Sequence, residues 1–434
     1  MPLTKIELRP GLNREGTDYS NSGGWFDGDK IRFRSGFPEK IGGWSRLSNN
    51  TFLGVARSLW NWIDLDGSNY VGIGTNLKYY IEKGGQYYDI TPIRKTVNPM
   101  AANPFSTSYS TLNGTVNSTQ TTITLTSTAS FPAGPVIIQI GTEQIYATTK
   151  SGSTLTGLIR GYNGTTAATH SSGAAVGCST ITVTDTSNGS TQNDFVTFSG
   201  ATAFGGFSTA EINAEQQITF ELSTSQYLIN ISGVFSTSAT SGGGAAVIAQ
   251  YQIITGLDVY VIGTGWGAGP WGRGGWGSGY TSGIGEQLRL WTADNFGQDL
   301  VLAPRGGSIY YWKDSTGVST RAQLLSSLAT GAGYSGQFVP TATNWIVSSD
   351  IQRFVIAFGA NPYNPTNSAT SFSPMTVRWS DQANPYQWIP QTVNQSGEYL
   401  LTNGSYIMGA RATRQEILVW TDTCLYSMQY LGAP

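Results

Sequence analysis

Very few residues of this chain are of types that support acid-base or nucleophilic chemistry. His170 is the only histidine, so a general base or a Ser-His-Asp scheme would rest on this one residue. It lies in the small-residue segment TTAATHSSGAA, and the charged residues available to orient it, Glu143, Arg160 and Asp185, lie at longer range in the sequence. We therefore expect no catalytic role for His170.

Two pairs of carboxylates are the nearest candidates for hydrolysis of a sugar bond, as in polysaccharide depolymerases. They are Asp294 with Asp299 and Asp381 with Glu398. Glycoside hydrolysis needs two acids that flank one substrate bond. Nothing in the sequence marks a shared cleft, so structural roles in turns or caps are favoured over catalysis.

The segment DLDGSN resembles half of a calcium-binding loop. Asp64, Asp66 and Asn69 supply alternating oxygen ligands and Gly67 permits a turn, but the later bidentate acid is missing. A hairpin turn between SLWNWI and YVGIG explains the same residues. Cys178 and Cys424 show no metal-ligand spacing and are too few for a disulfide framework. We expect neither a metal nor a cofactor.

The segment Gly263 to Gly279, GTGWGAGPWGRGGWGSG, contains a GxGxxG pattern at Gly267, Gly269 and Gly272. A dinucleotide site needs a helix directly after these glycines, and the Trp, Pro and Gly that follow cannot supply one. We interpret the segment as a docking loop whose indoles are buried against the protein itself or a neighbouring subunit. These indoles belong to Trp266, Trp271 and Trp276.

Aromatic side chains recur in strand-like segments. Such rings can stack on sugars or bases, but they more often fill a β core or a subunit interface. The residues concerned are Tyr79, Tyr80, Tyr87, Tyr88, Tyr310, Tyr311 and Trp312.

The composition is that of a folded protein with a nearly uncharged surface. Hydrophobic residues make up 39% of the 434 residues and charged residues only 12%, about half of the roughly 25% that is typical. With a net charge of −2, the chain suits a large assembly better than a free monomer.

The 24 basic and 26 acidic residues give no global nucleic-acid footprint. No apolar run is long enough for a membrane span, and the N-terminus lacks the apolar core of a signal peptide.

Strand-like segments bounded by Gly, Asn, Asp and Pro recur about every ten residues, which predicts an all-β fold. Helical spacing is confined to the short segments Ser208 to Gln217 and Thr320 to Leu328. Four hairpins recur, each with an aliphatic strand followed by a strand that ends in aromatic residues. Such a repeat favours a propeller, in which these hairpins would form the inner strands of successive blades. They are Val71 to Ile81, Leu300 to Trp312, Ile417 to Tyr430, and a looser copy that begins at Val355.

Two stretches without charge, Thr96 to Thr142 and Leu222 to Leu257, suggest inserted β modules. We predict an N-terminal part of a propeller-like body at residues 1–105, a first module at 106–177, a second at 178–250, and the rest of the body at 251–434. We also predict that both modules decorate the body rather than form part of it.

Several segments resemble tail tube or nozzle proteins of short-tailed double-stranded DNA bacteriophages. They are WTADNFGQDLVLAPRGGSIYYW, VRWSDQANPYQWIP, RATRQEILVWTDTCLYSMQY, the preceding Trp-Gly loop and the opening GLNREGTDYSNSGGWFDGDKIRFRSGFPEKIGGW. The resemblance covers about 1–95 and 251–434. The first module, with ASFPAG, GTEQIYAT and IRGYNGTTAATHSSGA, resembles a small β module of many phage virion proteins.

The resemblance implies a virion protein without enzymatic activity, assembled in the host cytoplasm. It implies a ring, six-fold in this family, that continues the DNA channel below the portal and adaptor, takes part in genome delivery and contacts other tail proteins such as fibres. DNA would pass through the lumen without sequence recognition. In this family the propeller-like region extends past the segment that ends here at Pro434, so we expect either a longer chain or a second polypeptide to complete it. A receptor-binding tail adhesin and a tail-associated polysaccharide hydrolase are the alternatives.

Overall fold

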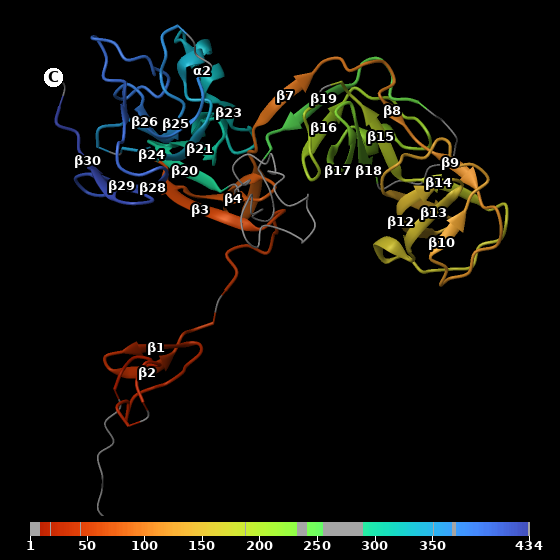
Figure 1. Cartoon of the computed structure of the whole chain (residues 1–434), viewed down its shortest axis with the longest axis horizontal. Coiled ribbons are helices and arrows are strands. Elements are labelled where there is room, and N and C mark those ends of the chain that lie inside the picture. Colours follow the sequence, from red (N-terminus) through yellow and green to blue (C-terminus); the bar gives the residue numbers. More distant parts are fainter. Residues whose placement is uncertain are drawn as a thin grey trace, which may run out of the picture. The chain divides into compact units, whose positions relative to one another are not determined.

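Antiparallel β-sheets make up almost all of the regular structure (Figure 1). The computed structural model describes residues 9–17, 19–43, 45–186, 188–231, 241–254, 290–349, 351–366 and 370–432. The chain divides into two compact units, Met1–Thr51 and Phe52–Pro434. The predicted all-β class is confirmed.

The first unit contains one hairpin, formed by β1 (Ile31–Arg34) and β2 (Phe37–Lys40). Ser35 and Gly36 connect the strands with φ angles of 50° and 86°. Two consecutive positive φ angles are what a tight hairpin turn requires, and glycine adopts them without steric cost.

Four sheets of the second unit form what we call the body. Each sheet is a meander, because strands consecutive in the sequence are also neighbours in the sheet. The strands are β3 (Ala56–Ile63), β4 (Asn69–Thr75), β5 (Tyr79–Lys83) and β6 (Gln86–Asp89); β20 (Trp291–Phe296), β21 (Asp299–Pro304), β22 (Tyr310–Trp312) and β23 (Gln323–Leu324); β24 (Thr343–Ser348), β25 (Val355–Ala360), β26 (Ser373–Trp379) and β27 (Gly397–Leu400); and β28 (Ile407–Ala412), β29 (Ile417–Thr421) and β30 (Leu425–Met428).

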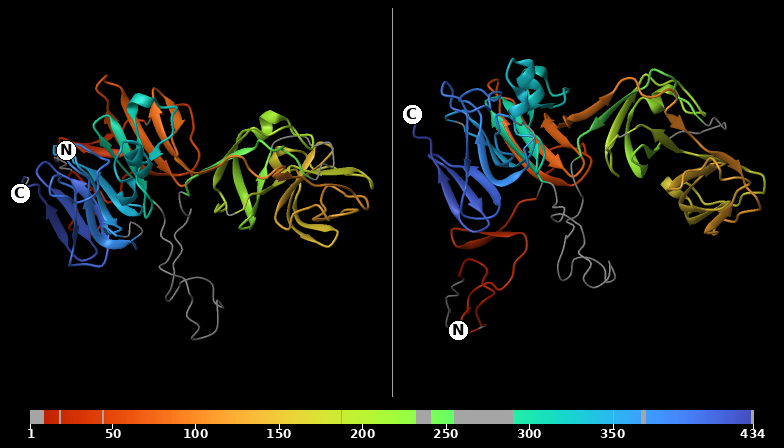
Figure 2. Two further views of the ribbon diagram at one scale, coloured as in Figure 1. Left: turned by 90° about the horizontal axis from the view of Figure 1, so that it is seen from above. Right: turned by 45° about the horizontal axis from the view of Figure 1, so that its top comes forward.

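The body is propeller-like, as the recurring hairpins predict. Each predicted hairpin supplies the second and third strands of its sheet. The first strand of each sheet contacts the next sheet, from β3 to β20, from β20 to β24 and from β24 to β28 (Figure 2). Stacking of successive meander sheets through their faces is the arrangement of propeller blades.

Three apolar clusters lie between successive body sheets. Trp62 and Trp312 pack between the first and second sheets, with ring centroids 6.3 Å apart. Ile346 and Val301 belong to the cluster between the second and third sheets. Phe358 of the third sheet packs in one cluster with residues of the fourth. Each sheet therefore buries apolar side chains against its neighbour.

Two further sheets form inserted modules, which appear in orange, yellow and green in Figures 1 and 2. Module 2 has the order β7-β19-β16-β17-β18-β15-β8 and module 1 has the order β10-β13-β12-β11-β14-β9. The strands of module 2 are β7 (Ile93–Val97), β8 (Phe105–Ser106), β15 (Thr180–Thr184), β16 (Phe195–Ser199), β17 (Glu215–Ser223), β18 (Gln226–Asn230) and β19 (Ile248–Gln252). Those of module 1 are β9 (Tyr109–Thr111), β10 (Thr122–Thr124), β11 (Val136–Ile140), β12 (Glu143–Ser151), β13 (Thr154–Ile159) and β14 (Ala175–Cys178).

Module 1 is nested within module 2, which the sequence did not indicate. Strands β7 and β8 come before module 1 in the chain but pair with β19 and β15 of module 2. Each module has an apolar cluster of its own. The domain boundaries at 105/106, 177/178 and 250/251 stay predictions, because strand pairing defines sheets rather than domains.

Helices are short, as the sequence predicts. Helix α1 (Thr209–Ile212) begins with a capping box, in which Ser208 and Glu211 each accept a hydrogen bond from the other's backbone amide. The others are α2 (Leu325–Gly331) and the 3-10 helices η1 (Tyr162–Gly164), η2 (Asp314–Thr316) and η3 (Gly336–Phe338). None of the helices in the described ranges has the length and apolar character needed to cross a bilayer.

Candidate functional site

The Trp-Gly segment lies outside the described residues. This applies to Trp266, Trp271 and Trp276, for which we predict a docking role, and to the GxGxxG glycines. Their roles stay predictions.

The outer face of the fourth body sheet exposes apolar side chains. In β29, Ile417 and Val419 are buried against the third sheet. Side chains alternate along a strand, so Leu418 and Trp420 point to the opposite face. Trp420 is paired with Leu425 of β30, and these side chains are 41% and 54% exposed. We call the surface formed by Leu418, Trp420 and Leu425 the open face.

The corresponding face of the third body sheet is covered by the fourth sheet. Phe358 and Val377 of the third sheet are opposite each other in register and pack against the fourth sheet, where both are nearly fully buried. Burying a large apolar side chain contributes about 1.5 to 3 kcal/mol. The open face is therefore suited to an apolar contact with another β-sheet.

Strand β30 also has a free edge, since β29 is its only partner among the described residues. The backbone amide of Thr421 donates to the carbonyl of Cys424 over 2.9 Å, which makes these two a hydrogen-bonded pair. Hydrogen-bonded and non-hydrogen-bonded pairs alternate in an antiparallel ladder. The backbone groups of Leu425 and Ser427 are therefore directed away from β29, toward the free edge. Such an edge can accept an added strand.

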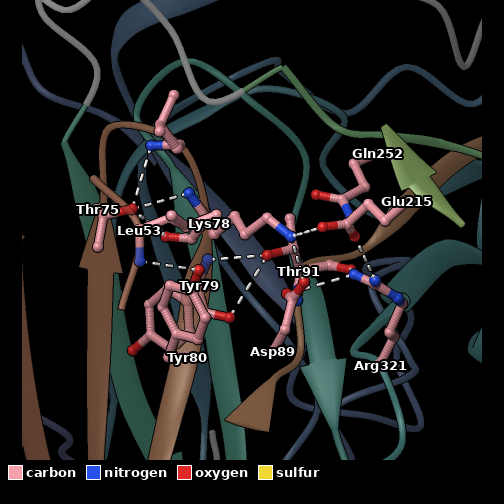
Figure 3. A network of polar contacts seen from close by, with 11 residues as sticks. Leu53, Thr75, Lys78, Tyr79, Tyr80, Asp89, Thr91, Glu215, Gln252 and Arg321 are labelled. Atoms are coloured by element: carbon pink, nitrogen blue, oxygen red, sulfur yellow. Dashed lines mark hydrogen bonds and ion pairs between the residues drawn. The ribbon is translucent and has the colours of Figure 1, made fainter. Parts of the chain in front are cut away.

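Four charged residues meet where module 2 joins the body (Figure 3). We call Lys78, Asp89, Glu215 and Arg321 the ionic joint. The ammonium nitrogen of Lys78 lies 2.7 Å from a carboxylate oxygen of Asp89 and also binds Glu215. Arg321 lies 3.3 Å from Asp89 and 3.1 Å from Glu215. Each carboxylate therefore binds both cations.

The ionic joint connects three sheets. Lys78 directly precedes β5 and Asp89 ends β6 of the first body sheet, Arg321 precedes β23 of the second, and Glu215 begins β17 of module 2. The side chain of Lys78 is only 3% exposed. Burial raises the pKa of Asp89, but the charges of Lys78 and Arg321 outweigh burial and hold this pKa below its usual value. The sequence did not reveal this cluster, because its members are far apart in the chain.

A second polar cluster lies inside module 1, around the fully buried carboxylate of Glu143. Arg160 binds both carboxylate oxygens at 2.7 Å, and Nε2 of His170 lies 2.6 Å from Oε2. The backbone amides of Gly161 and Ala168 donate over 3.2 and 3.1 Å. A carboxylate only accepts hydrogen bonds, so Nε2 of His170 carries the proton.

The Glu143 cluster is a structural clasp. Burial by itself raises the pKa of Glu143, but the hydrogen bonds from Arg160, His170 and the backbone lower it to about 2. The clasp joins the start of β12 to the end of β13 and to the segment around His170. The sequence indicated these residues as possible partners of His170 but did not predict their contact. The available signal was that Glu143 is the only carboxylate in 106–177.

A cavity of about 120 Å³ lies where the first strands of the four body sheets converge. Its lining includes Trp60 of β3, Asp294 of β20, Ser348 of β24 and Arg411 of β28. The guanidinium of Arg411 lies 5.1 Å from the ring centre of Trp60, a cation–π distance. The cavity thus combines an aromatic ring of the first body sheet with charged side chains of the second and fourth.

The four acids considered for hydrolysis accept hydrogen bonds from the backbone. Asp294 accepts from the amide of Ser348 over 2.8 Å and Asp299 from that of Asp314 over 2.9 Å. Asp381 accepts from the amides of Gln382 and Gln395, and Glu398 from that of Tyr363. Asp381 thus binds the adjacent amide of Gln382, whereas Asp294 and Glu398 lie within β20 and β27 and bind amides far away in the sequence.

The DLDGSN segment forms the turn between β3 and β4, as predicted. Asp64 accepts a hydrogen bond from the amide of Ser68 over 2.7 Å, and the amide of Gly67 donates to its carbonyl. Within the described ranges, no three His, Cys, Asp or Glu side chains are grouped as metal ligands. Most of the noted aromatics fill the body core: Tyr79, Tyr80, Tyr310, Tyr311 and Trp312 are buried, whereas Tyr87 and Tyr88 are half-buried.

Comparisons with known proteins do not identify a family. No protein family matches the chain, and no curated protein is significantly similar to it. Among solved structures, the chain is similar to a protein described as phage phi92 endosialidase, with 11% sequence identity and a TM-score of 0.18. The match covers 82% of this chain and 49% of the other, so the chain spans about half of that protein's length. A TM-score this low establishes neither a shared fold nor a shared activity.

Proposed function

We propose that this chain is a structural subunit of the tail of a short-tailed phage, in the nozzle ring that continues the DNA channel. The resemblance of the body segments and of the N-terminal segment to nozzle proteins supports this role. So does the propeller-like arrangement of the four body sheets. The partners would be further copies of the chain, the tail adaptor and fibres.

The observation that carries the proposal is the open face. A chain with only 12% charged residues has little electrostatic repulsion to keep copies apart. It also presents Trp420 and Leu425 on a sheet face whose counterpart in the preceding sheet is buried. Aromatic residues at the centre of a contact supply much of its binding energy. A ring forms when such contacts are heterologous and the rotation between subunits closes.

Mass photometry of the purified protein tests the assembly. We expect a closed ring, six-fold as the family resemblance implies. Particles no larger than a monomer, dimer or trimer would contradict the proposal.

A double substitution tests the surface. Trp420→Ser with Leu425→Ser should prevent ring formation while leaving the monomer folded, because both side chains are already exposed. Leu65→Ser is the matched control, since Leu65 is 87% exposed in the β3–β4 turn and lies outside the open face. Normal rings in the double variant would place the subunit contact elsewhere.

A further inference from the structure

Module 2 is joined to the body by only two crossings of the chain. The first lies between Asp89 at the end of β6 and Ile93 at the start of β7, and the second follows Gln252 at the end of β19. The crossings are tied to each other, because the amide of Ile253 donates to the carbonyl of Pro92 over 3.0 Å. Two adjacent strands of this kind can bend as a hinge unless a further contact holds them.

The apolar cores on the two sides of this connection are separate. The cluster of module 2 contains no body residue, and the cluster of the first two body sheets includes only Ile253 from beyond β19. Phe195 of module 2 does lie beside the body, with its ring centre 4.4 Å from the ammonium of Lys78. Among the described residues, the contact that could hold the hinge is therefore mainly one of charge.

Glu215 is the only charged member of the ionic joint that module 2 supplies. It binds Lys78 of the first body sheet and Arg321 of the second, and Gln252 of β19 donates to the same carboxylate. Without Glu215, the two cations would share Asp89 alone. A charged side chain that loses its partner while it stays partly buried raises the free energy of that arrangement. If the joint opens to water, the charged groups are solvated instead.

We propose that Glu215 is a latch that holds module 2, together with the nested module 1, in one orientation on the body. When the latch is broken, the paired crossings at Pro92 and Ile253 become a hinge. Each module keeps its own core, so the modules move as bodies and do not unfold. The inference rests on the described contacts and is independent of the proposed tail function.

Pulsed electron–electron double resonance on the full chain tests the latch. Spin labels are placed at Ser225→Cys in the β17–β18 turn and Ser315→Cys in η2, in a Cys424→Ser background; Cys178 is buried. We expect a narrow distance distribution, and Glu215→Gln should broaden it at least about twofold. The matched control is Glu221→Gln, an exposed carboxylate on the same strand, which should leave the distribution unchanged.

A second variant changes the body side of the latch. Arg321→Gln removes the other side of one ion pair and should broaden the same distribution. Unfolding curves of both variants should keep the transition of module 2. An unchanged distribution in either folded variant, or equal broadening in Glu221→Gln, would overturn the proposal. Loss of the unfolding transition of module 2 would also overturn the proposal, because it would show that the ionic joint is needed for module 2 to fold.

Discussion

At the scale of single residues, the buried charge of Glu143 organises part of module 1 in this weakly charged chain. Glu143 accepts five hydrogen bonds and holds together three segments of module 1. A buried carboxylate that keeps its charge must be paired and hydrogen-bonded, and here both conditions are met. Loss of a donor would therefore weaken the clasp, because the buried carboxylate would be less completely hydrogen-bonded.

Glu143→Gln should destabilise module 1 by about 3 kcal/mol, because it leaves the buried guanidinium of Arg160 without a counter-charge. Hydrogen exchange of the β12 amides, followed by mass spectrometry, measures the loss locally. Glu221→Gln serves as the control, since its carboxylate is exposed. Equal protection of β12 in wild type and Glu143→Gln would show that the clasp contributes little.

The clasp also predicts an acid dependence. The pKa of Glu143 is lowered from 4.5 to about 2 in the folded protein, so folding favours the ionised form. The stabilisation is complete above pH 4.5 and is lost as the pH falls from there through about 2. The contribution of the clasp to protection of β12 should decline over this interval in wild type and be absent from Glu143→Gln. The same decline in the variant would assign the acid dependence to another group.

At the scale of elements, the separate apolar clusters indicate that module 1 can be removed. Its ends are close, because Tyr109 of β9 is paired with Gly177. Replacing Gly114 to Gly177 by a short Gly-Ser linker should leave the body and module 2 folded. The cost should be within about 1 to 2 kcal/mol, since the replacement exposes apolar surface such as that of Phe220, which lies against Gly134. Cooperative thermal unfolding checks this, and insoluble protein would show that module 1 belongs to the core.

At the scale of the whole molecule, we expect the Trp-Gly segment to contribute to assembly or to the stability of the body. Ordering its glycines costs about 1 to 2 kcal/mol each, which only burial of its indoles, roughly 150 to 250 Å² per ring, can offset. Combined Trp266→Ser, Trp271→Ser and Trp276→Ser should abolish rings or lower the melting temperature. Mass photometry and calorimetry check this. Wild-type behaviour of the triple variant would favour a host-contact or glycan-binding tip, and so the adhesin.

The sequence by itself determined the fold class and the recurring hairpins, because these depend on local patterns. Val71 to Ile81 already shows two strands and a turn, and DLDGSN already shows which residues make the turn before them. Burial of aromatic side chains could be predicted from the same patterns, since Tyr79 and Trp312 lie in apolar strands that must be covered. Local alternation and turn chemistry are properties of neighbouring residues, and they can be recognised without knowledge of the fold.

Only the tertiary structure decided which distant residues meet. Lys78 and Glu215 are separated by 137 positions, and their contact depends on how module 2 is attached to the body. The strand β7 belongs to module 2 because β19 returns to pair with it, which no local pattern could show. His170 binds Glu143 only because the chain between β13 and β14 folds back over β12. Ion pairs and sheet neighbours of this kind depend on the path of the whole chain, so they arise only when the elements are assembled.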